Sequence, residues 1–197
     1  MTKIHTLLSS VSIPKQNDRV MMIASKAGFL TVPECESIIK QGRNQDSVAG
    51  SLGGEDEINE STRRSDVTYL VHNDENAWLY DRLGLEIQQV NAEAYGYQLS
   101  GIEAIQLATY DEGDFYDWHT DLGEGDNSTR KLSLSIQLTP SNQYDGGELE
   151  FMKVAETCMT EQGAIIFFPS FLHHQVKPVT RGRRYSLVAW VHGDAFK

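Results

Sequence analysis

The chain has 197 residues, of which 40% are hydrophobic, and a formal net charge of −11 at pH 7. This length and apolar content suffice for one domain with a buried core. The acidic balance excludes a general nucleic-acid-binding role, because such binding depends on Lys and Arg side chains that neutralise the phosphate backbone.

The cysteines and the apolar segments indicate the cellular compartment that we expect for the protein. Cys35 and Cys158 lie far apart and lack Cys-x-x-Cys spacing, so neither a disulfide framework nor a structural zinc site is indicated. No apolar run approaches the length that spans a membrane. We therefore expect a cytoplasmic protein without a membrane partner. The sequence defines no oligomeric state.

The N-terminal part predicts a short extended piece and a helix. Residues 1–30 are expected to be loop, with residues 20–23 extended. Thr31 and Glu34 form a capping-box pattern, and Pro33 falls in the first turn, where its missing N–H costs nothing. Gly42 marks the expected end of this helix.

Residues 42–62 are rich in glycine, followed by an acidic run at 55–57, and have few apolar side chains. We expect a mobile loop here. It is either a solvent-exposed excursion or a lid over a substrate, and the exposed excursion is favoured.

A strand is predicted at 67–71, followed by a long helix within 75–97. Apolar residues recur through the helix at helical spacing, which predicts a stripe that packs on the outside of a sheet. The stripe consists of Leu79, Leu83, Ile87, Val90, Ala94 and Tyr97.

From residue 104 the pattern becomes strand after strand, separated by turns at 142–147, 161–163 and 180–182. Between 131 and 138 apolar residues alternate with Ser133, Ser135 and Gln137, so one face is polar and meets either solvent or a hydrated cavity. The predicted strands are 104–110, 115–121, 131–138, 148–152, 164–168, 174–179 and 184–191.

This order of elements predicts a mainly β protein with N-terminal helices (α+β). Many short antiparallel strands behind a few helices are typical of a jelly-roll, that is, a cupin-like double-stranded β-helix. We expect a single domain over residues 1–197. Helical and loop support would occupy about residues 1–100 and a metal-binding β core about residues 101–193.

His119 and Asp121 are the first candidate metal ligands. Residues i and i+2 of a strand point to the same face, roughly 6 to 7 Å apart along the backbone, so both side chains can reach one ion. The alternative is a hydrogen-bonded pair on a wet strand. A third ligand must come from another strand, and His173 or His174 can supply it, but not both, because adjacent residues face opposite sides. Two imidazoles and one carboxylate form the facial arrangement of non-haem Fe(II) oxygenases.

Several motifs resemble the 2-oxoglutarate and Fe(II)-dependent dioxygenases of the prolyl 4-hydroxylase-like group. They are the block from Tyr110 to Asp121, with Gly113, Tyr116 and His119; Arg130-Lys131-Leu132-Ser133; Gly146-Gly147-Glu148-Leu149; and the segment from Phe168-Pro169-Ser170 to Trp190. Together they cover roughly residues 104–193 in the family's order.

The resemblance implies that His119, Asp121 and His174 hold Fe(II), because His174 begins the family's His-x-Val-x-Pro-Val pattern. It also implies that Arg184 binds the distal carboxylate of 2-oxoglutarate, a task that suits a planar and permanently charged guanidinium. Ser186, two residues further on, is expected to add a hydroxyl donor, and Tyr110 to reach the same co-substrate.

The remaining candidates have structural interpretations. His173 is expected at the surface or behind the ligands, and His5, His72 and His192 are expected to be structural or exposed. Trp118, Tyr116 and Trp190 either line the wall of the site or pack in the core, and core packing is favoured for each.

The resemblance implies hydroxylation that consumes 2-oxoglutarate and O2, yields succinate and CO2, and brings ascorbate into consideration as a cofactor. The expected substrate is a prolyl residue of a peptide or protein, with another amino-acid residue or a small molecule as alternatives. Two rival functions are a metal-dependent hydrolase and a noncatalytic cupin-like metal-binding module.

Overall fold

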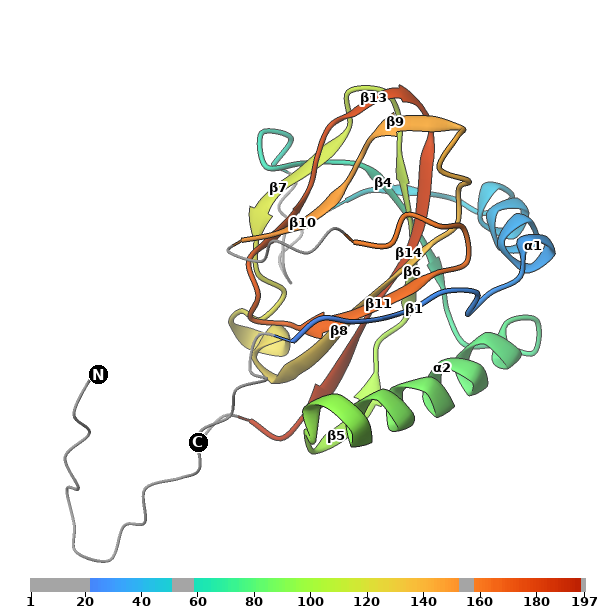
Figure 1. Ribbon diagram of the computed structural model, residues 1–197. Helices are drawn as coiled ribbons and strands as arrows, with labels where there is room; N and C mark the ends of the chain where they lie inside the picture. Colours follow the sequence, from blue (N-terminus) through green and yellow to red (C-terminus); the bar gives the residue numbers. More distant parts are fainter. Residues whose placement is uncertain (1–21, 51–58, 153–157, 196–197) are drawn as a thin grey trace, which may run out of the picture.

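Apolar and polar residues alternate along β8 (Arg130–Gln137). This strand lies inside the larger of two facing sheets (Figure 1). The computed structural model describes residues 22–50, 59–152 and 158–195. The larger sheet has eight strands. Their order is β1 (Ala24–Lys26), β11 (Ile165–Pro169), β8, β14 (Arg184–Gly193), β6 (Ile105–Tyr110), β4 (Asp66–Leu70) and β2 (Val48–Ala49), with β5 (Leu99–Ile102) also paired to β14.

The smaller sheet faces the polar side of the larger one. It has four strands in the order β10 (Leu149–Phe151), β12 (His174–Val176), β7 (Phe115–His119) and β3 (Arg63–Arg64). A further pair, β13 (Val179–Gly182) and β9 (Tyr144–Gly146), closes one end. All of these pairings are antiparallel. The predicted double-stranded β-helix core is confirmed.

Two helices, α1 (Val32–Arg43) and α2 (Ala77–Val90), cover the other face of the larger sheet (Figure 1). Leu79, Leu83 and Ile87 of α2 are buried in one cluster with the sheet residues Leu107 and Leu134. This confirms the predicted apolar stripe. The helix is shorter than predicted, because it changes to a π-helical turn at Asn91–Tyr95 and ends at Gly96, whose φ is 67°.

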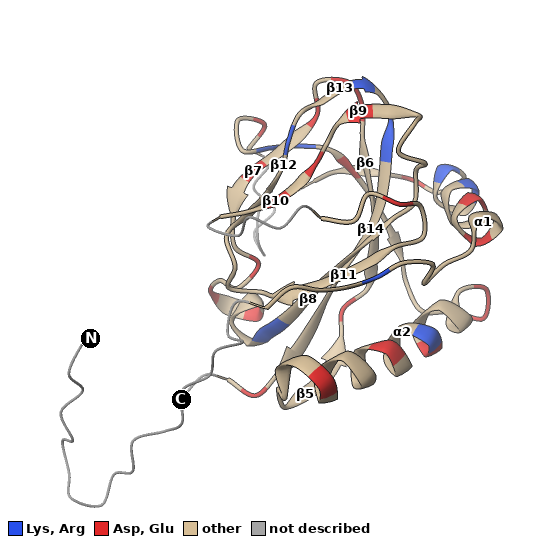
Figure 2. Cartoon of the chain, in the orientation of Figure 1, with Lys and Arg blue, Asp and Glu red and all other residues tan. Residues whose placement is uncertain are grey.

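Both helices contain acidic and basic residues (Figure 2). Mixed charge of this kind is expected on a solvated face. In the residues that the structure describes, neither helix has the length and apolar character needed to cross a bilayer.

Several predicted boundaries were wrong. Extended structure begins at Ala24, later than predicted, and residues 20 and 21 lie outside the described part. Of the predicted loop at 42–62, residues 48–49 form β2 and residues 51–58 lie outside the described part, so the question of a lid falls there too. The segments predicted as turns at 142–147 and 180–182 contain β9 and β13, which pair with each other. Gly146 and Gly182 have positive φ within these strands and so gave a turn signal.

Helix α1 begins with the predicted capping box. The Glu34 carboxylate accepts hydrogen bonds from the backbone N–H of Thr31 at 2.8 Å and from its hydroxyl at 2.9 Å. Arg82 of α2 donates to both oxygens of the same carboxylate, at 2.7 and 2.9 Å. The Arg82 and Thr31 hydrogen bonds lower the pKa of Glu34 to about 2. One carboxylate thus caps α1 and joins it to α2.

Replacing this carboxylate should weaken the helix pair in a pH-dependent way. We predict that Glu34→Gln lowers the free energy of unfolding at pH 7 by about 0.5–1 kcal/mol, as expected for a partly exposed cap and ion pair. Because the folded pKa lies below the unfolded value, the carboxylate stabilises the fold above about pH 4.5 and loses this effect as the pH falls toward 2. Denaturant unfolding at pH 7 and pH 3.5 measures the difference. Glu36→Gln removes the same charge from the same helix and should have little effect at either pH.

Candidate metal centre and co-substrate site

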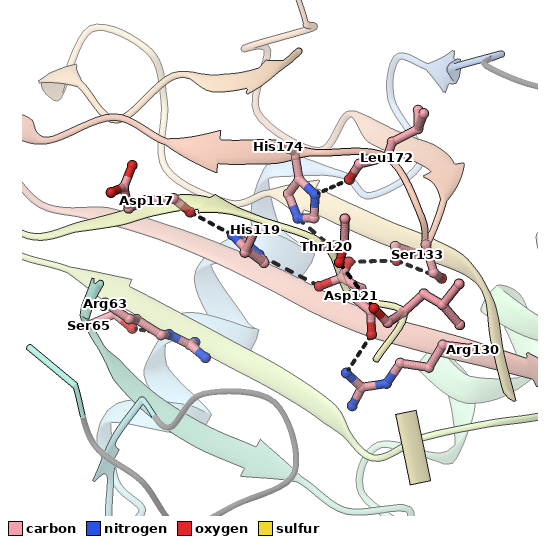
Figure 3. A network of polar contacts seen from close by, with 12 residues as sticks. Arg63, Ser65, Asp117, His119, Thr120, Asp121, Arg130, Ser133, Leu172 and His174 are labelled. Carbon is pink, nitrogen blue, oxygen red and sulfur yellow. Dashed lines mark hydrogen bonds and ion pairs between the residues drawn. The ribbon is translucent and has the colours of Figure 1, made fainter. Parts of the chain in front are cut away.

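Three potential ligands converge between the two sheets. His119 ends β7, His174 begins β12, and the pairing of these strands places the two histidines directly opposite each other. Asp121 lies between them, with its carboxylate oxygens 3.6 Å from Nε2 of His119 and 3.6 Å from Nε2 of His174 (Figure 3). One ligand atom from each residue lies within 4.8 Å of the others. The structure therefore brings together the triad that the motifs indicated.

Asp121 reaches this position differently from our prediction. Strand β7 ends at His119, so Asp121 is not two residues along the same strand. Instead, the backbone N–H groups of Asp121 and Leu122 both donate to the carbonyl of Ser170 at 2.9 Å. The prediction of a strand to residue 121 was wrong, because this loop pairs with the turn after β11 and not with a neighbouring strand.

Each histidine is oriented by a backbone carbonyl. Nδ1 of His119 lies 2.7 Å from the carbonyl oxygen of Asp117, and Nδ1 of His174 lies 2.9 Å from that of Leu172. A carbonyl can only accept, so both Nδ1 atoms carry the proton and both Nε2 lone pairs face the triad. Orientation of this kind is the usual support for histidines that bind metals.

Burial and the neighbouring groups shift the pKa values of His119 and Asp121. Desolvation, followed by the neighbouring His174, lowers the pKa of His119 to about 4. Burial pushes the pKa of Asp121 upward, but His174, His119 and a hydrogen bond from Ser133 together hold it below its usual value. At neutral pH the site thus presents imidazole nitrogen and carboxylate oxygen, a donor set that fits Fe(II).

A bulge in β7 adds an aromatic wall. Val176 pairs with Tyr116 while His174 pairs with His119, so β7 has one more residue than β12 over this interval. The extra residue turns Tyr116 and His119 to the same side. Their rings stack at 3.5 Å between centroids and 10° between planes. The guanidinium of Arg63 lies 4.7 Å above the Tyr116 ring. Core packing was favoured for Tyr116, but this contact with a candidate ligand agrees with the alternative, a place in the wall of the site.

Arg184 lies in the same interior between the sheets. It is 4% exposed, it donates from Nη1 to the Ser186 hydroxyl at 3.2 Å, and its guanidinium lies 5.6 Å from the ring centroid of Tyr110. The three residues of the predicted co-substrate site are therefore neighbours. A Cβ at Gly147, whose φ is 65°, would come within 2.9 Å of Cδ of Arg184, so glycine leaves room for the arginine.

The charge of Arg184 is not compensated within the described chain. None of the ion pairs formed by residues 22–50, 59–152 and 158–195 includes it. An unpaired buried cation is costly, whereas a cation paired with an anion is tolerated. The surroundings of Arg184 therefore suit an anionic ligand.

The polar face of β8 connects the triad to Arg184. Ser133, Ser135 and Gln137 are all less than a tenth exposed, which settles that this face meets an interior and not bulk solvent. Ser133 contacts Asp121 at one end, and Gln137 pairs in register with Ser186 at the other. The predicted alternation is confirmed, and its polar side forms the floor of the site.

A second group of side chains lies beside Asp121. The Arg130 guanidinium lies 4.0 Å over the Trp190 ring and donates to the Glu103 carboxylate at 2.5 and 2.7 Å. His192 meets the same carboxylate at 2.7 Å. Trp190 also lowers the pKa of Asp121, although its indole nitrogen has no hydrogen-bond partner of normal geometry among the described residues. Sequence reasoning missed this group, since its members lie far apart in the chain.

The other expectations have mixed outcomes. His173 is exposed, as expected, and takes no part in the triad. His72 packs edge-on against Tyr80, and His5 lies outside the described residues. Trp118 was wrongly favoured as a core residue, because the bulge leaves it 38% exposed.

Comparisons with known proteins agree with this geometry. Residues 105–192 match the 2OG-Fe(II) oxygenase superfamily. A PKHD-type hydroxylase from Hyphomonas neptunium is 33% identical over 136 residues, which are 61% of this chain and 60% of the relative. Another, from a Synechococcus strain, is 35% identical over 46% of this chain and 43% of the relative. The chain therefore spans less than two thirds of the length of these relatives.

Solved structures show the same fold. A Pseudomonas putida prolyl-4-hydroxylase superposes with a TM-score of 0.70 at 20% identity, covering 89% of this chain and 94% of that one. A Trichoplax adhaerens prolyl hydroxylase, solved with a peptide fragment of hypoxia inducible factor, has a TM-score of 0.73 at 18% identity and covers 87% and 83% of the two chains.

Residues 105–192, which include most of the β core, are thus similar to the 2OG-Fe(II) oxygenase superfamily. The similar PKHD-type hydroxylases and the shared fold of the prolyl hydroxylase structures agree with the resemblance to the prolyl 4-hydroxylase-like group that the motifs indicated. This match implies Fe(II), 2-oxoglutarate and O2, and the donor set of the triad fits the metal.

The adjacent histidines allow a direct test of the metal site. We predict that His174→Ala lowers the affinity for Fe(II), measured anaerobically, by orders of magnitude while the circular dichroism of the fold is retained. His173→Ala is the matched control, because it removes an exposed imidazole one residue away and should bind Fe(II) like the wild type. Equal binding by both variants would exclude His174 as a ligand.

Proposed function

We propose that the protein is a 2-oxoglutarate- and Fe(II)-dependent dioxygenase that hydroxylates a prolyl residue, or another amino-acid residue, of a peptide or protein. Succinate and CO2 would be the co-products. The observation that carries this proposal is the buried Arg184, which lacks a carboxylate partner in the described chain and shares an interior with the His119, Asp121 and His174 triad.

In this proposal the side chains divide the work. His119, Asp121 and His174 hold Fe(II), and Arg184 pairs with the distal carboxylate of 2-oxoglutarate. Ser186 supports the guanidinium and Tyr110 packs against it. When bound, Fe(II) with 2-oxoglutarate and O2 supplies the oxidising chemistry that replaces a C–H bond by C–OH. The enclosing sheets orient the reactants and keep bulk water away.

A solved neighbour supports a peptide as the substrate. The Trichoplax neighbour was solved with a peptide fragment. A small-molecule substrate would use the same core residues with different contacts at the mouth.

The proposal extends to domain organisation and setting. We propose one domain over the whole chain, with residues up to about 100 supporting the β core. Neither Cys35 nor Cys158 forms a disulfide in the described part of the chain, which suits the reducing cytoplasm. Ascorbate would serve as an accessory reductant.

The assay follows from the proposed reaction. We predict that the protein with Fe(II), 2-oxoglutarate and ascorbate converts 2-oxoglutarate to succinate, and that Pro-containing peptides accelerate this conversion and gain one oxygen atom by mass spectrometry. The same peptides with Ala in place of Pro serve as controls, and Lys-containing peptides test the alternative side chain. Peptide or ester cleavage that needs no 2-oxoglutarate would instead indicate a metal-dependent hydrolase. Metal binding that raises the melting temperature without any turnover would indicate a cupin-like structural module.

The role of Arg184 has a separate test. We predict that Arg184→Ala raises the KM for 2-oxoglutarate about 10- to 100-fold, because a hydrogen bond to a charged group contributes about 1.5–3 kcal/mol. Arg184→Lys should recover part of the loss, since it restores the charge without the paired donors. Arg181→Ala, which removes an exposed arginine paired with Asp145, is the control. An unchanged KM in Arg184→Ala would contradict the assignment.

A further inference from the structure

A buried hydroxyl contacts one of the three candidate ligands. Oγ of Ser133 donates a hydrogen bond to Oδ2 of Asp121 at 2.6 Å (Figure 3). Ser133 is 0% exposed and lies in β8. Such a position ordinarily holds an apolar residue, because a buried hydroxyl without a partner destabilises the fold. The carboxylate supplies that partner.

A second buried hydroxyl fixes the direction of the first. Oγ of Ser170 lies 3.0 Å from Oγ of Ser133 and is also 0% exposed. A serine hydroxyl has one proton, so if Ser133 donates to Asp121 it must accept from Ser170. The result is a directed chain from Ser170 through Ser133 to the carboxylate. A hydroxyl that donates to an ionised oxygen makes one of the stronger hydrogen bonds in proteins.

The segment that contains Ser170 supports two ligands at once. The Ser170 carbonyl accepts from the backbone N–H of Asp121, so Ser170 fixes both the main chain and, through Ser133, the side chain of this residue. Two residues later, the Leu172 carbonyl accepts from Nδ1 of His174. The turn that links β11 to β12 therefore sets the relative position of a carboxylate and an imidazole.

We propose that Ser133, oriented by Ser170, is a positioning residue that makes Asp121 bind the metal through a single oxygen. This inference rests on the metal site of the proposed function. An oxygen that accepts a short hydrogen bond is a weaker metal ligand, so Oδ1 becomes the coordinating atom. A carboxylate that chelates with both oxygens takes an additional coordination position. The serine pair thus reserves that position for the co-substrate.

The test uses the full chain and Co(II), whose visible absorption reports both affinity and coordination number. Ser133→Ala should weaken Co(II) binding about 10- to 100-fold, the range found when support of a metal ligand is removed. The absorption spectrum of its Co(II) form should also change shape, and 2-oxoglutarate should bind that form more weakly. Ser25→Ala is the matched control, because it removes a hydroxyl from an exposed position in β1 of the same sheet, outside the site. It should match the wild type in all three measurements.

Two further variants separate positioning from general stability. Ser170→Ala should shift Co(II) affinity in the same direction by a smaller factor, since Ser133 keeps its own hydroxyl, and it carries the test if Ser133→Ala does not fold. Ser133→Thr retains the hydroxyl and should restore the wild-type spectrum. The inference is overturned if a folded Ser133→Ala, or Ser170→Ala in its place, has the Co(II) affinity and spectrum of Ser25→Ala. A wild type that binds no Co(II) would instead overturn the proposed function itself.

Discussion

The site depends on a constraint that applies to every buried sheet face, namely that its polar groups must find partners. One face of the larger sheet meets this constraint with apolar side chains packed under α1 and α2. The other face carries Ser133, Ser135, Gln137, Arg184 and Ser186, all buried. Some of these find partners within the chain, as Ser133 does with Asp121. Arg184 finds no anion among the described residues, and that unmet requirement makes the interior suited to an anionic ligand.

The arrangement divides stability from chemistry. The apolar cluster between the helices and the sheet contains the fully buried leucines and isoleucines, whose burial contributes most of the free energy of folding. The triad lies on the opposite side, where β7 and β12 of the smaller sheet approach the polar face of β8. A costly group of buried imidazoles and a carboxylate can persist there, because the other face of the same sheet offsets its cost.

The main elements of the fold and the candidate ligands could be predicted from the sequence. The contacts that support the site could not, because they depend on pairing between residues far apart in the chain. The alternation in β8, the capping box of α1 and the apolar stripe of α2 are local patterns, and all three were confirmed. The residues that form the triad and the Arg184 site carried family motifs, so their proximity was expected. The contact between Tyr116 and His119 was not, because regular alternation places residues three apart on opposite faces.

The residues that hold Asp121 in place could not be predicted from the sequence either. Ser133 and Ser170 are 12 and 49 positions beyond Asp121 in the sequence, and only the pairing of β8 with β11 brings them together. Arg130, Glu103 and His192 are likewise joined by neighbouring strands. A single sequence does not give the register between distant strands. The candidate ligands could therefore be predicted from it, but the residues that hydrogen-bond to them could not.

The bulge in β7 also determines which changes the site can tolerate. The side chains of Asp117 and Trp118 point outward and are exposed, while the Asp117 carbonyl orients His119 through the main chain. Any amino acid at position 117 would supply this carbonyl, although the Asp117 carboxylate also accepts a hydrogen bond from the backbone N–H of Trp118 at 2.7 Å. Loss of either residue would restore regular pairing with β12 and turn Tyr116 away from His119. Substitutions in the bulge are therefore better tolerated than deletions, which would change its length.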